Sequence, residues 1–250
     1  HRNYSPSRRD ADCAATYDRA LAAAADQISA RRVHLLGLGC GGGQKDTRLL
    51  RSLQAPHREI SYTPCDVSVA MVLVARQAAL AVVPAGNCFP LVCDLALAGD
   101  LPAWFDMRIA PDTARLVTFF GMIPNFEPST ILPRLAALVR PGDLLLFSAN
   151  LAPGRNYAAG LKEILPQYDN APTRKWLLQF LLDLGVERGD GDLRFAVEPG
   201  PARSGLGRVV ARFHFAKPRR LEVEGEVFAF RPRDSIRLFF SYRYTPARVR

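Results

Sequence analysis

The first 150 residues alternate between short apolar runs and longer segments whose apolar residues recur at helical spacing. The apolar runs predict five strands, at 31–38, 59–66, 89–94, 114–122 and 144–151. The segments between and before them predict helices at 10–31, 46–53, 67–83 and 128–140. Strands that alternate with helices are typical of a parallel sheet covered by helices on both faces, so we predict an α/β fold.

The pattern changes after Leu151. Helical segments are expected within 155–185, a Gly/Pro-rich loop at 189–205, and antiparallel strands within 207–244. We therefore predict four segments: an N-terminal helical extension (1–32), a ligand-binding core (33–150), a helical insertion that caps the substrate (151–206), and C-terminal antiparallel strands that complete the sheet and the substrate site (207–250).

A glycine cluster follows the first predicted strand, with five glycines in the seven positions 37–43. Ligands of parallel α/β sheets bind beyond the carboxyl ends of the strands, and this cluster lies at such an end. Gly37, Gly39 and Gly42 satisfy the GxGxxG dinucleotide fingerprint. The same letters fit the turn of class I S-adenosylmethionine (SAM) methyltransferases, with Gly39, Gly41 and Gly43 in the turn.

Two acids at later strand ends favour SAM over a nicotinamide or other nucleotide. Asp66 closes the second predicted strand, where a carboxylate can accept both ribose hydroxyl protons, and Asp94 closes the third, where an acid can pair with the adenine amino group. The chain also lacks a Tyr-x-x-x-Lys motif or a His–Asp pair for hydride chemistry. Asp66 as a helix cap and Asp94 as a plain loop acid stay open as alternatives.

The net charge bears on nucleic-acid binding, and the cysteine content bears on the cellular compartment. The net charge is +9. The last twenty residues contain one acid, Asp234, and six arginines: Arg231, Arg233, Arg237, Arg243, Arg248 and Arg250. Because no stretch interleaves aromatic and basic residues, we expect a solvated cationic edge rather than a nucleic-acid surface. Five cysteines without a CxxC pair predict reduced thiols and a cytoplasmic protein.

Metal and membrane binding are not expected. The four histidines lack ligand spacing, and the apolar stretch 67–83 is interrupted by Arg76 and Gln77. The chain opens at His1 without Met or a signal-peptide pattern, so we expect its natural start to lie further upstream.

Five stretches resemble the histidine-specific SAM-dependent methyltransferases, a class I family that includes the enzyme that trimethylates the α-amine of histidine. They are "GGGQKDTRLL" (41–50), "YTPCDVS" (62–68), "FFGMIPNF" (119–126), "PQYDNAPTRKWLLQFLLDLGV" (166–186) and "FSYRYT" (240–245). The resemblance implies a Rossmann-like class I methyltransferase sheet with a helical insertion and antiparallel C-terminal strands. It also implies a SAM site made of Gly39, Gly41, Gly43, Lys45, Asp66, Asp94 and Gly121.

The same resemblance implies three residues at the acceptor. Asn125 looks like the asparagine that orients the amino-acid substrate, Tyr168 like the tyrosine that binds its carboxylate, and Ser241 like the serine that helps to read the imidazole. Two positions depart from the family. Gly37 stands where an acid opens the glycine motif, so one SAM contact must come from elsewhere, and Phe239 replaces a glutamate that reads the imidazole with the serine.

We therefore predict a SAM-dependent N-methyltransferase whose acceptor is an amine of an amino acid, a derivative or a peptide, and for which free histidine is a poor acceptor. Two alternatives stay open. Gly37 and Phe239 could mark an inactive SAM-binding partner protein, and the arginine-rich tail could mark a nucleic-acid methyltransferase. The second lacks the (Asn/Asp)-Pro-Pro-aromatic motif of base-amine methylases, because Pro124 precedes Asn125.

Overall fold

The computed structural model describes residues 10–202 and 204–249. The chain divides into two compact units, one that ends at Ser148 and one that begins at Ala149. The first unit contains the predicted helical extension together with the ligand-binding core, although residues 1–9 of that extension lie outside the described residues. The second unit contains the predicted insertion together with the C-terminal strands.

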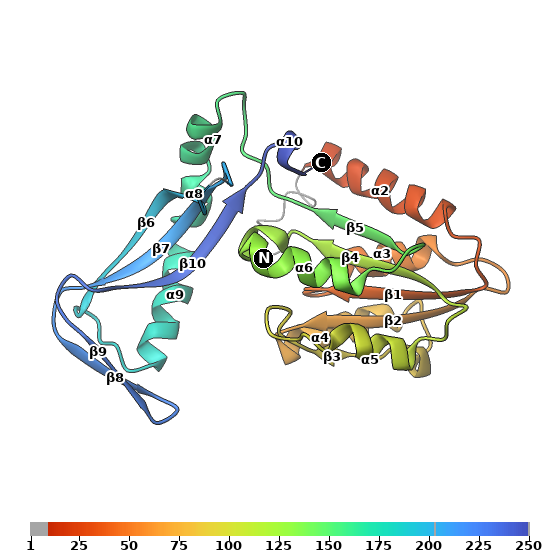
Figure 1. The fold of residues 1–250 in the computed structure, drawn as a ribbon, viewed down its shortest axis with the longest axis horizontal. Coiled ribbons are helices and arrows are strands. Elements are labelled where there is room, and N and C mark those ends of the chain that lie inside the picture. The colour runs from red at the N-terminus through yellow and green to blue at the C-terminus, as the bar shows by residue number, and fades with distance from the viewer. Residues whose placement is uncertain (1–9, 203, 250) are drawn as a thin grey trace. The chain divides into compact units, whose positions relative to one another are not determined.

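A five-stranded parallel sheet forms the first unit, in the order β3-β2-β1-β4-β5. Figure 1 shows the strands in this order, with β3 at the bottom and β5 at the top. Their bounds are β1 (Arg32–Leu38), β2 (Glu59–Asp66), β3 (Leu91–Val92), β4 (Ala114–Phe120) and β5 (Leu144–Ser148). This architecture confirms the α/β fold and the Rossmann-like parallel sheet that the resemblance implies.

Helices cover both faces of this sheet. The first face packs against α2 (Ala11–Asp26), α3 (Gln44–Ser52) and α4 (Val69–Ala79), through a core that includes Leu21, Leu35, Leu49, Tyr62 and Ala79. Because strand residues alternate between faces, His34 and Leu36 point to the opposite face, where α5 (Leu101–Arg108) and α6 (Pro128–Leu138) lie. The sequence analysis did not predict α5, and the helix predicted at 10–31 ends at Asp26.

The second unit holds its own sheet. Three antiparallel strands run in the order β10-β7-β6, beside a separate hairpin of β8 and β9. Their bounds are β6 (Gly191–Pro199), β7 (Gly207–Phe215), β8 (Arg219–Val223), β9 (Glu226–Phe230) and β10 (Ser235–Arg243). The helices are α7 (Tyr157–Glu163), α8 (Leu165–Tyr168), α9 (Ala171–Asp183) and α10 (Pro246–Val249). The first unit also contains two single-turn helices, η1 (Ala85–Asn87) and η2 (Ile123–Asn125).

Two expectations about this unit are wrong. The strands of 207–250 do not complete the parallel sheet, and the predicted loop 189–205 contains the strand β6. The physical reason is that the alternating strands present one apolar face, which α9 covers with Leu177 and Leu181. This face therefore has a core of its own and needs no edge of the parallel sheet.

Candidate functional site

The glycine turn joins β1 to α3, and its backbone conformation and close contacts favour glycine. Gly39 and Gly43 have positive φ angles of 58° and 70°. A Cβ on Gly39 would lie 2.5 Å from Met122 Cγ, and one on Gly43 would lie 2.8 Å from Ala75 Cα. A Cβ on Gly41 would meet no atom within 4 Å. The turn thus packs against Met122 and Ala75 at Gly39 and Gly43, and its backbone is open at Gly41, where a ligand can approach it.

Asp46, in the first turn of α3, fills the space beside Gly37. A Cβ on Gly37 would lie 2.1 Å from Asp46 Oδ2, so a side chain at position 37 and this carboxylate exclude each other. Asp46 is buried and accepts hydrogen bonds from Tyr62 Oη at 2.7 Å and from Thr118 Oγ1 at 2.8 Å. Burial raises its pKa to about 6, although both hydrogen bonds act to lower it. The sequence analysis did not identify this acid.

Lys45, a predicted SAM-binding residue, is held by an aromatic residue of α2. Its Nζ donates to Tyr17 Oη at 3.2 Å and lies 4.4 Å from the centre of the Tyr17 ring. Tyr17 Oη in turn donates to Ser148 Oγ at 2.8 Å, at the carboxyl end of β5. The Tyr17 ring meets Phe120 edge to face at 5.6 Å. The helical extension therefore contributes a positioning residue at the strand ends, which the sequence analysis also missed.

Asp66 lies at the end of β2 and contacts the glycine turn directly. Its Oδ2 accepts from the Gly41 N–H at 3.0 Å, and its Oδ1 accepts from the Ser68 N–H at 3.0 Å. The N-cap of α4 is Ser68, so the alternative interpretation of Asp66 as the helix cap is wrong. An ionised carboxylate offers about four acceptor positions, so two hydrogen bonds leave capacity for a hydroxyl-bearing ligand.

Asp94 and Gly121 occupy the neighbouring strand ends. Asp94 follows β3, is exposed, accepts from the Ala96 N–H at 2.8 Å and lines a hollow of about 360 Å³. Gly121 follows β4 with a positive φ of 72°, donates its N–H to the Ser148 carbonyl at 3.1 Å, and has no atom within 4 Å of the place of a Cβ. Every predicted SAM-binding residue thus lies at the carboxyl edge of the parallel sheet.

Asn125 ends η2, in the segment that follows β4. Its side chain is exposed, and no described residue forms a hydrogen bond with the side-chain amide. The N-cap of α6 is Glu127, so Asn125 is not the cap of that helix. Its amide is therefore available to a ligand.

In the second unit, the side chains of Tyr168 and Ser241 lie together. Tyr168 Oη donates to Ser241 Oγ at 3.1 Å. Phe239, Ser241 and Arg243 alternate along β10 and so share one face of the strand. The Phe239 ring lies 5.4 Å from the Tyr168 ring, and Arg243 Nη2 donates to Tyr168 Oη at 2.6 Å.

Arg243 is a third buried residue of these clusters that was not predicted from the sequence as a site residue. Its side chain is only 5% exposed, and its Nε is buried without a hydrogen-bond partner. No described acid forms an ion pair with it, and burial lowers its pKa, with Tyr168 opposing the shift. Arginine remains charged inside proteins, so this cluster holds a buried positive charge whose side-chain hydrogen-bond partner among the described residues is the Tyr168 hydroxyl.

Cysteine and metal chemistry find no support in the described part of the chain. All five cysteines are free, and burial raises the pKa of the Cys40 and Cys65 thiols, which keeps them protonated. The described residues contain no cluster of His, Cys, Asp and Glu that could hold a metal ion. Among the same residues, no helix has the length and apolar character that crossing a membrane requires.

Comparisons with known proteins identify a family. The family model "Histidine-specific methyltransferase, SAM-dependent" matches residues 2–182. No curated protein matches the chain. Similar solved structures include the cyclase SpnF (20% identity, 55% of this chain and 46% of that chain, TM-score 0.40) and the mitomycin 7-O-methyltransferase MmcR (17% identity, 82% and 58%, TM-score 0.41).

A further similar structure is a SAM-dependent methyltransferase from Thiobacillus denitrificans in complex with S-adenosyl-L-homocysteine (18% identity, 79% of this chain and 70% of that chain, TM-score 0.41). The chain spans 46% and 58% of SpnF and MmcR, about half of their length. The family match covers most of the chain, including the glycine turn, Lys45 and Asp66. The chain therefore belongs to the histidine-specific, SAM-dependent methyltransferase family.

Proposed function

We propose that this protein transfers a methyl group from SAM to the amine nitrogen of an amino acid, an amino-acid derivative or a peptide that carries a free carboxylate, and that histidine is not its preferred acceptor. The observation that carries this proposal is the buried, acid-free guanidinium of Arg243 beside Tyr168. A buried cation without a counter-ion is costly, and an incoming carboxylate relieves that cost while it forms charge-assisted hydrogen bonds.

The residues of the first unit fit SAM. The open backbone at Gly41 leaves room for the cofactor against the turn, and Asp66 keeps acceptor positions for the two ribose hydroxyls. Lys45, fixed by Tyr17, supplies a cation suited to the carboxylate of the methionine part. Asp46 supplies the negative charge that the family places at the position of Gly37.

SAM supplies a methyl group already activated by its sulfonium, so the protein's own task is proximity and alignment, with the reacting atoms about 3–3.5 Å apart. The attacking amine must be neutral. The free amide oxygen of Asn125 is suited to accept one amine N–H, which directs the nitrogen lone pair toward the methyl group. In the second unit, Arg243 and Tyr168 are suited to bind a carboxylate.

Phe239 supports an acceptor other than histidine. Its ring packs against Tyr168 on the face of β10 that also carries Ser241, so the position of the family's glutamate presents an apolar surface. An imidazole N–H placed there would lose its acceptor, at a cost of about 1–3 kcal/mol. An aromatic or aliphatic side chain would instead gain contact area.

The test is a methyl-transfer assay with the full chain, SAM and a panel of aromatic, aliphatic and histidine acceptors, with S-adenosylhomocysteine release and product mass as readouts. We expect N-methylated aromatic or aliphatic products and weak histidine turnover, with histidine turnover rising in Phe239→Glu. Turnover restricted to DNA or RNA, SAM binding without turnover of any acceptor, or histidine as the best acceptor would contradict the proposal.

Arg243→Met tests the anchor itself. We expect KM for carboxylate acceptors to rise about 10- to 100-fold, the equivalent of a lost charged hydrogen bond, while KM for the matching carboxamides stays unchanged. Arg237→Met is the matched control, because it makes the same change at an exposed position of β10. Equal losses on acids and amides would assign Arg243 a purely structural role.

A further inference from the structure

A second cavity lies in the first unit, away from the glycine turn. It has a volume of about 330 Å³ and is enclosed by the first halves of β1 and β2 on one side and by α5 on the other. Arg32 and Glu59, the first residues of β1 and β2, lie at its rim, so it opens at the amino edge of the sheet. Its volume falls at the lower end of the range for small-molecule sites, about 300–1,000 Å³.

Two buried polar side chains line this cavity and present atoms that no described group satisfies. His34 is 3% exposed and its Nε2 has no hydrogen-bond partner; Thr63 is 1% exposed and its Oγ1 has none. His34 pairs in register with Ser61, two positions before Thr63 on β2, so both side chains point to the same face of the sheet. Unsatisfied buried polar atoms are rare in folded proteins, and two in one cavity indicate a missing partner.

His34 presents its Nε2 to the cavity, and its Nδ1 pairs with Ser61. Ser61 Oγ lies 2.8 Å from His34 Nδ1 and 3.4 Å from the Val33 carbonyl oxygen, so its one proton can be donated to either. Nε2 is therefore an acceptor in one tautomer of the neutral ring and a donor in the other. Burial, assisted by the charge of Arg115, lowers the pKa of His34 to about 4, so the ring is neutral at pH 7.

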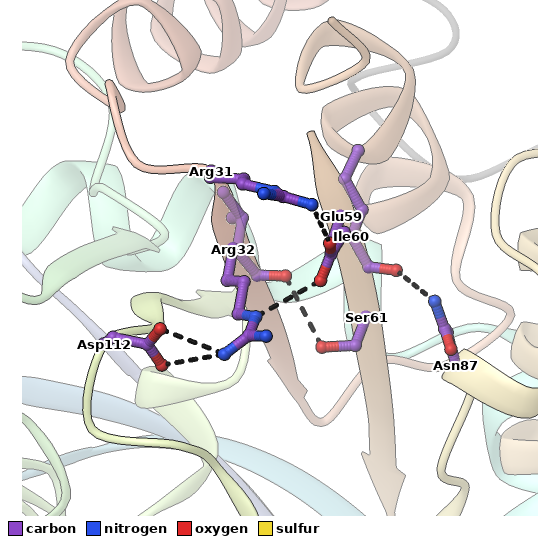
Figure 2. Close-up of polar contacts among 8 residues, drawn as sticks. Arg31, Arg32, Glu59, Ile60, Ser61, Asn87 and Asp112 are labelled. Carbon is purple, nitrogen blue, oxygen red and sulfur yellow. Dashed lines mark hydrogen bonds and ion pairs between the residues drawn. The ribbon is translucent and has the colours of Figure 1, made fainter. Parts of the chain in front are cut away.

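Charged side chains at the rim of the cavity pair with one another. Arg31 Nη2 donates to Glu59 at 2.9 Å, Arg32 Nε donates to Glu59 at 3.2 Å, and Arg32 Nη1 donates to Asp112 at 3.0 Å. Figure 2 shows these four side chains joined by dashed lines near the beginning of the two strands. Arg108, a further cation, also lines the cavity, so these charges do not select the ligand, and the polar atoms and the aromatic wall do.

Aromatic side chains from α5 form the opposite wall. The rings of Trp104 and Phe105 lie 4.9 Å apart, and Phe105 lies 6.2 Å from the His34 ring. The Arg108 guanidinium covers the Trp104 ring at 4.5 Å. Aromatic walls favour a planar ligand that can stack or pack edge to face.

We propose that this cavity binds a planar heterocycle that presents the adjacent N–H and C=O of a lactam, as a pyrimidine base does, to His34 Nε2 and Thr63 Oγ1. Both atoms lack a partner, the lactam edge supplies one donor and one acceptor for them in either tautomer of His34, and the aromatic wall favours a flat ring. The site is separate from the SAM turn and does not depend on the proposed methyl acceptor.

The experiment uses uracil as the probe and the full chain saturated with S-adenosylhomocysteine, so that the adenosyl site is filled. Amide chemical shifts of labelled protein report where uracil binds. We expect saturable shifts at His34, Thr63 and Trp104, and none with 1,3-dimethyluracil, which has the same ring without an N–H. An absence of shifts at these residues with uracil, or equal binding of both compounds, would overturn the proposal without bearing on methyl transfer.

Thr63→Val adds a second readout, because valine keeps the shape and removes the hydroxyl. We expect uracil affinity to fall about tenfold, as for one buried hydrogen bond. The stability of the unliganded protein should not fall, since the lost hydroxyl had no partner.

Thr47→Val is the matched control for stability. The Thr47 hydroxyl is buried and donates to the Gly43 carbonyl at 2.8 Å, so its loss should destabilise the fold. Equal destabilisation by both variants would show that Thr63 is already paired and would refute the site.

Discussion

Asp46→Asn removes a buried negative charge beneath the glycine turn while it keeps the shape of the side chain. The amide oxygen can still accept from Tyr62 Oη, which bonds the carboxylate at 2.7 Å. The amide NH₂ can donate to Thr118 Oγ1, because that hydroxyl is also placed to donate to the Leu36 carbonyl at 3.4 Å. The hydrogen-bond network therefore survives, and the variant isolates the effect of the charge.

The magnitude follows from the pKa of Asp46, which burial raises from 3.8 to about 6. The folded state holds this proton more tightly than the unfolded chain, so the free energy of unfolding falls as the pH rises between these values and stays low above them. A rise of about two pH units corresponds to about 3 kcal/mol. We expect Asp46→Asn to be more stable than the wild type at pH 8 by up to that amount, and the difference to vanish near pH 4.

Urea unfolding between pH 4 and pH 8 measures this difference, with tryptophan fluorescence as the probe. The chain has two tryptophans, and Trp176 in the second unit is 65% exposed. Trp176→Phe in both proteins leaves Trp104 to report on the first unit alone. A stability difference that is the same at pH 5 and pH 8, or a variant less stable than the wild type at pH 8, would refute the argument.

Two further variants test the cofactor site. Tyr17→Phe removes the hydroxyl that accepts from Lys45 and donates to Ser148, so we expect SAM affinity, measured by calorimetry, to fall about 5- to 20-fold with an unchanged circular dichroism spectrum. Asp66→Ala removes the proposed ribose acceptor, so S-adenosylhomocysteine should bind more weakly by at least ~1.5–3 kcal/mol. Unchanged affinity in either variant would remove that residue from the site.

The parts of the fold that the sequence predicts are those whose cause is local. The strands β1, β4 and β5 consist mostly of apolar residues, and β2 alternates Ile60 and Tyr62 with polar residues, so each shows a local strand pattern. The helix α5 escaped prediction because its eight residues mix apolar, acidic and basic side chains without a clear stripe. The strand β6 was missed because the glycines and prolines around it obscured the alternation of Leu193, Phe195 and Val197.

The candidate site likewise contains some residues that the sequence predicts and others that it does not. The glycine turn, Asp66 and Gly121 follow strand ends, so their position in the chain predicts their position in space. Tyr17, Asp46 and Arg243 could not be found like this, because each acquires its role from a partner distant in sequence. Lys45 lies 28 residues from Tyr17, Tyr62 lies 16 from Asp46, and Tyr168 lies 75 from Arg243. Only the folded chain brings these pairs together.

Gly37 shows why a departure from a family pattern is poor evidence of decay. The family's acid at this position could not coexist with Asp46, whose Oδ2 would lie 2.1 Å from the added Cβ. The glycine leaves room for Asp46, which places a carboxylate beside the turn from α3. We expect Gly37→Asp alone to destabilise the first unit and to abolish SAM binding, whereas Gly37→Asp combined with Asp46→Ala recovers both in part. Calorimetry and urea unfolding measure the two effects. If the double variant binds SAM no more tightly and is no more stable than Gly37→Asp, the two acids are not interchangeable. Gly37 would then be evidence of lost function.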